Sequence, residues 1–195
     1  MKITIGDYLR IDTRIGVIKE IILPFQLQLD KIAEICKKDN YIYWDCTFAD
    51  DFEHFAGTVF IILQNYINSS ISDLFEDGVK LNTKYKLDKK VNNSNTTRVE
   101  LIIAIANYYK HRDLPTKLHP NTVKPFDDLN IKYKETYDEQ SDKNHHIVGS
   151  CSPVYNGFSL LSELWNFNDL IDIVTDWREN IWLIEEELTK LQFKK

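Results

Sequence analysis

Residues 97–111, TRVELIIAIANYYKH, contain one of the most apolar runs in the chain. Thr97 and Glu100 have the T-x-x-E spacing of a capping box, in which each side chain binds a backbone N–H at the start of a helix. Apolar side chains then follow on nearly every side, which is typical of a helix at the centre of a bundle. We therefore predict an all-α fold built around this segment.

Three further segments show helical periodicity. In the first, apolar side chains recur at alternating steps of three and four from Tyr8 to Cys36, so we expect one long N-terminal helix that is kinked at Pro24. The segment at about 50–75 has a wide apolar face. The segment at about 168–192 has one continuous line of apolar side chains at steps of three and four. We therefore expect a helical bundle in a single domain, 1–195. Its four main helices are predicted at about 7–38, 50–75, 97–111 and 168–192.

The segments between these helices are expected to be mostly loop. Residues 77–95 are polar and rich in Asn and Lys, as in a surface connector. After the third helix, Pro115, Pro120 and Pro125 fall within eleven residues and argue against a regular helix. We predict a long proline-rich loop over 111–157, followed by a short helix at Leu160–Trp165.

Charge and cysteine content narrow the class of protein. The formal net charge is −6 and the pI about 5.4, which argues against non-specific binding to a nucleic-acid backbone. Three cysteines without C-x-x-C spacing predict neither a disulfide framework nor a structural zinc site. No apolar run reads as a signal peptide or membrane span. We expect a cytoplasmic protein without metal or cofactor.

The predicted third helix ends in polar and ionisable side chains. Asn107 and His111 lie four residues apart, on one face of a helix, and Lys110 is beside them. Either this polar end is part of a binding site, or it is where a buried helix reaches the surface. In the second case we expect Asn107 and His111 to hydrogen-bond the long loop that follows.

Just beyond this end, Arg112, Asp113 and His119 form the pattern R-D-x5-H. This resembles the R-x(4–6)-H signature of HEPN proteins, all-α bundles that include many ribonucleases of bacterial toxin and defence systems. The resemblance implies metal-independent RNA cleavage, with Arg112 and His119 in a cleft between two protomers and Asp113 in the polar position after the arginine. An arginine can hold the scissile phosphate while a histidine moves a proton.

A second hypothesis is a binding protein. The acidic Asp127 and Asp128, and the tyrosines Tyr133 and Tyr137, suit a surface that captures a basic protein. In outline the chain is similar to small acidic immunity proteins of bacterial toxin systems. We favour this hypothesis: an immunity protein that neutralises a basic, nuclease-type toxin. The HEPN-like ribonuclease is the alternative, RNA is a partner only in that case, and a homodimer is possible.

Overall fold

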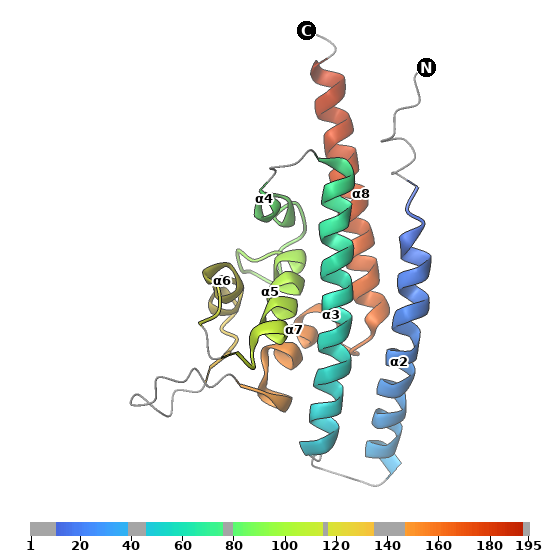
Figure 1. Ribbon diagram of the computed structural model, residues 1–195, viewed down its shortest axis with the longest axis vertical. Coiled ribbons are helices and arrows are strands. Elements are labelled where there is room, and N and C mark those ends of the chain that lie inside the picture. The colour runs from blue at the N-terminus through green and yellow to red at the C-terminus, as the bar shows by residue number, and fades with distance from the viewer. Residues whose placement is uncertain (1–10, 39–45, 76–79, 115–116, 135–146, 193–195) are drawn as a thin grey trace.

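Helices alone make up the regular secondary structure of the described part of the chain. The structure is a computed structural model that describes residues 11–38, 46–75, 80–114, 117–134 and 147–192, and within them there is no β-strand (Figure 1). The predicted all-α class is therefore confirmed, but the count of four helices is not. The described residues form seven α-helices and one 3-10 helix: α2 (Arg14–Lys38), α3 (Cys46–Leu74), α4 (Leu81–Tyr85), α5 (Arg98–His111), α6 (Pro120–Asp128), η1 (Gly149–Cys151), α7 (Pro153–Leu161) and α8 (Phe167–Gln192).

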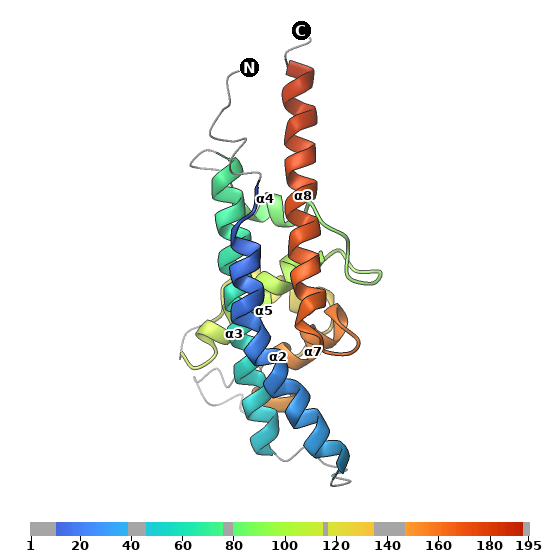
Figure 2. The same cartoon turned by 90° about the vertical axis from the view of Figure 1, so that its right-hand side faces the viewer.

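Three long helices, α2, α3 and α8, run along the long axis of the molecule (Figures 1 and 2). Their predicted apolar seams face the core. In α2 the buried seam residues are Ile18, Ile22, Leu29 and Ile32, and in α8 they are Phe167, Leu170, Val174, Trp177 and Ile181. The helix α2 continues through Pro24 as one element, as expected. None of the described helices is long and apolar enough to cross a membrane.

The short helix α5 occupies the centre of the fold. It packs mainly against α3 and α6, and every residue from Leu101 to Ala106 is buried. The predicted capping box is present: the Glu100 N–H donates to Thr97 Oγ1 at 3.1 Å, and the Thr97 N–H donates to Glu100 Oε2 at 3.0 Å. An apolar sequence with a well-defined start therefore places this helix inside the protein.

Two glycines allow other helices to approach α5 closely. The Tyr109 ring lies across Gly57 of α3, so that a Cβ built at this glycine would be only 2.3 Å from the ring. On another side of α5, a Cβ at Gly157 of α7 would be 2.4 Å from the Ile105 side chain. The absence of a side chain at both positions is what permits these helix contacts.

Several predicted boundaries are wrong. Arg14 begins the first helix and Cys46 begins α3, whereas we expected about 7 and 50. The connector 77–95 contains the short helix α4, and the predicted loop over 111–157 contains α6. Pro120 does not oppose α6, because it is at the first helical position, where its missing N–H costs nothing, and the helix also accommodates Pro125 in its interior. The short helix predicted at Leu160–Trp165 lies instead at Pro153–Leu161.

We predict that Gly57→Ala lowers the free energy of unfolding by about 1–3 kcal/mol, because the new methyl group collides with the Tyr109 ring. Urea denaturation measures this change. Gly16→Ala is the matched control: Gly16 is also helical, but its added Cβ meets nothing within 4 Å. That variant should gain up to about 1 kcal/mol from helix propensity. Equal effects at the two glycines would contradict the packing account.

Candidate functional site

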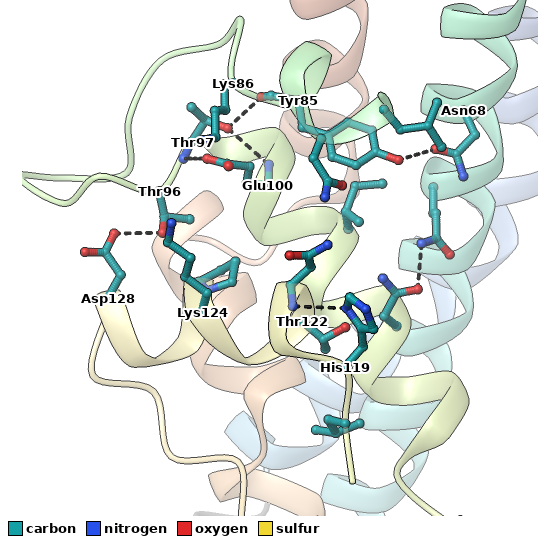
Figure 3. Close-up of a pocket in the computed structure, with 18 of the residues that line it drawn as sticks. Asn68, Tyr85, Lys86, Thr96, Thr97, Glu100, His119, Thr122, Lys124 and Asp128 are labelled. Atoms are coloured by element: carbon teal, nitrogen blue, oxygen red, sulfur yellow. Dashed lines mark hydrogen bonds between the residues drawn. The ribbon is translucent and has the colours of Figure 1, made fainter. Parts of the chain in front are cut away.

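A large groove opens between α3, α4, α5 and α6 (Figure 3). Its volume is about 1060 Å³, slightly above the range of about 300–1,000 Å³ for small-molecule sites. The helix α5 supplies the floor with Glu100, Ile103, Asn107, Lys110 and His111, which recur at helical spacing. The polar end of the predicted central helix is therefore part of the floor of a groove.

The lining of the groove is polar and carries many possible cations. It includes five lysines and two histidines, all of them exposed: Lys86, Lys90, Lys110, Lys117, Lys124, His111 and His119. Seven side-chain amides add hydrogen-bonding capacity: Gln64, Asn65, Asn68, Asn82, Asn95, Asn107 and Asn121. Such a surface is suited to a ligand rich in negative charge and hydrogen-bond acceptors.

The three carboxylates on the lining already have partners within the protein. Asp88 accepts two hydrogen bonds from the Arg98 guanidinium, at 2.6 and 3.2 Å. Glu100 is engaged in the capping box. Asp128 Oδ2 accepts from Thr96 Oγ1 and from the Asn95 N–H, both at 2.8 Å. The Thr96 hydroxyl is the main reason that the pKa of Asp128 lies below its ordinary value.

The charge of the chain is divided along the sequence. Residues 80–134, which form α4, α5, α6 and the segments between them, contain 12 Lys and Arg but only 5 Asp and Glu. The remaining 140 residues contain 12 Lys and Arg and 25 Asp and Glu. A net charge of −6 therefore conceals a basic segment, and that segment supplies most of the groove.

A hydrogen-bonded chain joins α5 to α3 in the wall of the groove. Lys110 Nζ donates to Gln64 Oε1 at 2.6 Å, and Gln64 Nε2 donates to Asn107 Oδ1 at 2.9 Å. Partial burial lowers the pKa of Lys110. We had expected Asn107 to hold the loop after α5, but it bonds α3 instead. His111 is exposed on the groove lining.

His119 lies at the start of α6, on the lining of the groove (Figure 3). It is the residue before Pro120, and its Nδ1 accepts a hydrogen bond from the Asn121 N–H at 3.1 Å. The imidazole thus caps the helix with one nitrogen. Because a backbone N–H can only donate, a neutral His119 carries its proton on Nε2.

Arg112 has a different environment. Its side chain is 7% exposed and forms an ion pair with the 1% exposed carboxylate of Glu53 on α3. The guanidinium also lies over the Tyr109 ring, 4.7 Å from the ring centroid. The structure thus places Arg112 in a buried contact between helices and His119 on the groove, while Asp113 is exposed at 3.8 Å from Arg112.

The other predicted binding residues are dispersed. Asp127 is exposed, and Asp128 holds the loop before α5 through Thr96 and Asn95. Tyr133 was expected to be an exposed anchor, but it is half-buried and packs against Phe126 at a centroid distance of 6.0 Å. Tyr137 lies outside the described residues.

Comparisons with known proteins found no match. No family model matches the chain, and neither does any curated protein or solved structure. Within the described residues, no group of three or more His, Cys, Asp or Glu side chains is placed to hold a metal ion. The groove is therefore interpreted from its own chemistry.

Sequence reasoning identified the α5 side of the groove but missed most of the rest. Asn107, Lys110 and His111 were predicted as binding residues, and all three line it. The amides of α3 and the lysines before α5 were not predicted. The uneven distribution of charge along the chain was the available signal, since 80–134 is strongly basic.

We predict that Glu53→Gln lowers the free energy of unfolding by about 3–5 kcal/mol, because it leaves the buried Arg112 without its counter-charge. Chemical denaturation measures the change. Asp113→Asn removes the exposed carboxylate beside the same arginine and should stay within about 0.5 kcal/mol of the wild type. A small effect for Glu53→Gln would contradict a structural role for this pair.

Proposed function

We propose that this protein binds single-stranded RNA in the groove between α3, α4, α5 and α6. The observation that carries the proposal is the separation of charge within the lining: its lysines are exposed, whereas its three carboxylates are engaged within the protein. A groove of this kind attracts a phosphate backbone even when the protein as a whole is acidic.

The extent of the groove favours a polymer over a single phosphate. Lys86 and Lys90 belong to the segment after α4, Lys110 is on α5, and Lys117 and Lys124 flank the start of α6. Lysines distributed in this way can follow successive phosphates of one strand. The aromatic ring on the lining, Tyr85, is 6% exposed, so hydrogen bonds and charge, rather than base stacking, supply the binding.

The proposal assigns binding and no cleavage step. In the HEPN-like alternative, Arg112 would hold the scissile phosphate. Its guanidinium is instead engaged by Glu53 beneath Tyr109, which supports a structural role. His119 remains on the groove as a donor toward a bound strand.

We predict that Lys117→Gln with Lys124→Gln weakens binding of a labelled 12-nucleotide single-stranded RNA, measured by fluorescence anisotropy. Loss of phosphate contacts should also reduce the slope of log K against log salt by about 0.7 for each lysine removed. Lys19→Gln with Lys31→Gln is the matched control, because it removes the same charge from the exposed face of α2.

Three results would count against this proposal. Equal losses in the two double variants would mean that only net charge matters. Displacement of the RNA by an equal charge of polyglutamate would point to an acidic protein ligand. Shortened RNA on a denaturing gel, abolished by His119→Gln, would support the HEPN-like ribonuclease instead.

A second candidate is the immunity protein, and one observation favours it. The helix α8 carries four exposed carboxylates at steps of three and four residues, on Asp169, Asp172, Asp176 and Glu179. None of the four carboxylates of this acidic stripe is among the residues that line the groove. Such a stripe suits a basic protein partner.

For this candidate we predict that Asp172→Asn with Asp176→Asn abolishes capture of a basic protein by the immobilised chain. The carboxylates give the long-range attraction and the contacts, so their loss should slow association and weaken the complex. The Lys117→Gln, Lys124→Gln variant should retain that protein. A partner kept by both variants would show that it does not bind the α8 stripe.

A further inference from the structure

We propose that the groove reads bases as well as phosphates, and that it prefers the keto bases uracil and guanine over the amino bases cytosine and adenine. The inference rests on the proposed RNA binding and adds a specificity to it. It follows from the direction in which four polar side chains of the lining are held: Asn68, Asn107, Lys110 and His119.

Lys110 fixes the orientation of the Asn107 amide through Gln64, which hydrogen-bonds both residues. A lysine ammonium can only donate, so the atom of Gln64 at 2.6 Å from Lys110 Nζ is the amide oxygen. Gln64 Nε2 then points the other way and donates to Asn107 Oδ1. The Asn107 oxygen is thereby held against α3, and its Nδ2, with two N–H donors, is the end that meets a ligand.

The Asn68 amide has the same orientation in the structure, with its oxygen at the Tyr85 hydroxyl (Figure 3). The Tyr85 hydroxyl donates to Asn68 Oδ1 at 2.7 Å. Burial raises the pKa of Tyr85 to about 12, so the hydroxyl keeps its proton at neutral pH. Asn68, like Asn107, therefore turns its oxygen toward the protein and leaves Nδ2 for the groove.

The start of α6 also presents a donor. The Asn121 N–H occupies His119 Nδ1, which leaves Nε2–H as the donor of the neutral ring. Lys110 adds further N–H groups beside Asn107. The groove thus offers donors at positions where an unconstrained asparagine or histidine could offer either a donor or an acceptor.

Donors of this kind distinguish the bases. Uracil, like thymine, has a carbonyl acceptor at position 4, and guanine has acceptors at O6 and N7. Cytosine and adenine instead place an amino group, a donor, at N4 and N6, the positions equivalent to uracil O4 and guanine O6, whereas N7 is an acceptor in both purines. An amino group facing Asn68 or Asn107 would bring two hydrogen-bond donors together. An N–H buried there would have no acceptor, which weakens binding.

The experiment compares oligo(U) with oligo(C), each of 12 nucleotides, at the same pH and salt by fluorescence anisotropy. The two strands have the same charge and the same ring size, and they differ in hydrogen bonding at the base edge. We expect oligo(U) to bind about tenfold more tightly than oligo(C). Both should weaken in the Lys117→Gln, Lys124→Gln variant.

Two variants test the source of the preference. Asn107→Asp replaces the donor with an acceptor, so the ratio of oligo(U) to oligo(C) affinity should fall and can reverse, since a carboxylate accepts from cytosine N4. Asn82→Asp is its control: Asn82 is exposed on the same lining, and the same added charge there should weaken both strands equally. Tyr85→Phe releases the Asn68 amide without a change of charge and should also lower the ratio.

The outcomes separate this inference from the function on which it rests. Equal affinity for oligo(U) and oligo(C), with both dependent on Lys117 and Lys124, would overturn base reading and leave RNA binding intact. No binding of either strand would overturn both. A ratio unchanged by Tyr85→Phe and by a folded Asn107→Asp variant would show that these amides do not read the bases.

Discussion

The carboxylate of Glu53 connects the parts of the fold on which the rest depends. One of its oxygens contacts Arg112 at the end of α5, and the other accepts from the Gly149 N–H at 2.7 Å. A charge buried in this way is tolerated only when its partners satisfy it, so α3, the end of α5 and η1 must assemble together. The Tyr108 hydroxyl donates to the Ile147 carbonyl and so adds a second contact between α5 and the segment that leads into η1.

The ion pair with Glu53 also explains why neighbouring residues at the end of α5 have different environments. Arg112 turns inward to Glu53, whereas Lys110 and His111 remain on the groove. Consecutive positions on a helix differ by about 100° in direction, so neighbours in sequence can face opposite environments. Arg112 and His119 are seven residues apart and have separate roles: one stabilises a helix contact, and the other caps α6 at the edge of the groove.

The groove derives its polarity from the way its hydrogen bonds are distributed. Carboxylates that line it bind backbone and side-chain donors of the protein, and the oxygens of Asn68 and Asn107 point toward Tyr85 and Gln64. Acceptors are therefore largely used internally, and donors are left for a ligand. The groove therefore presents cations and hydrogen-bond donors although the protein as a whole is acidic. This contrast is the physical basis for proposing RNA as the ligand.

The sequence by itself determined the helices whose apolar periodicity or capping is local, namely α2, most of α3, α5 with its Thr97 capping box, and α8. It also predicted Asn107, Lys110 and His111 as binding residues, and the structure places all three on the lining of the groove. Only the tertiary structure decided that Arg112 is buried, that Tyr133 packs inward, and that amides of α3 face lysines near α6. Those outcomes depend on which side chains meet across separate helices, and hydrophobic periodicity within one helix carries no information about its polar partners on another.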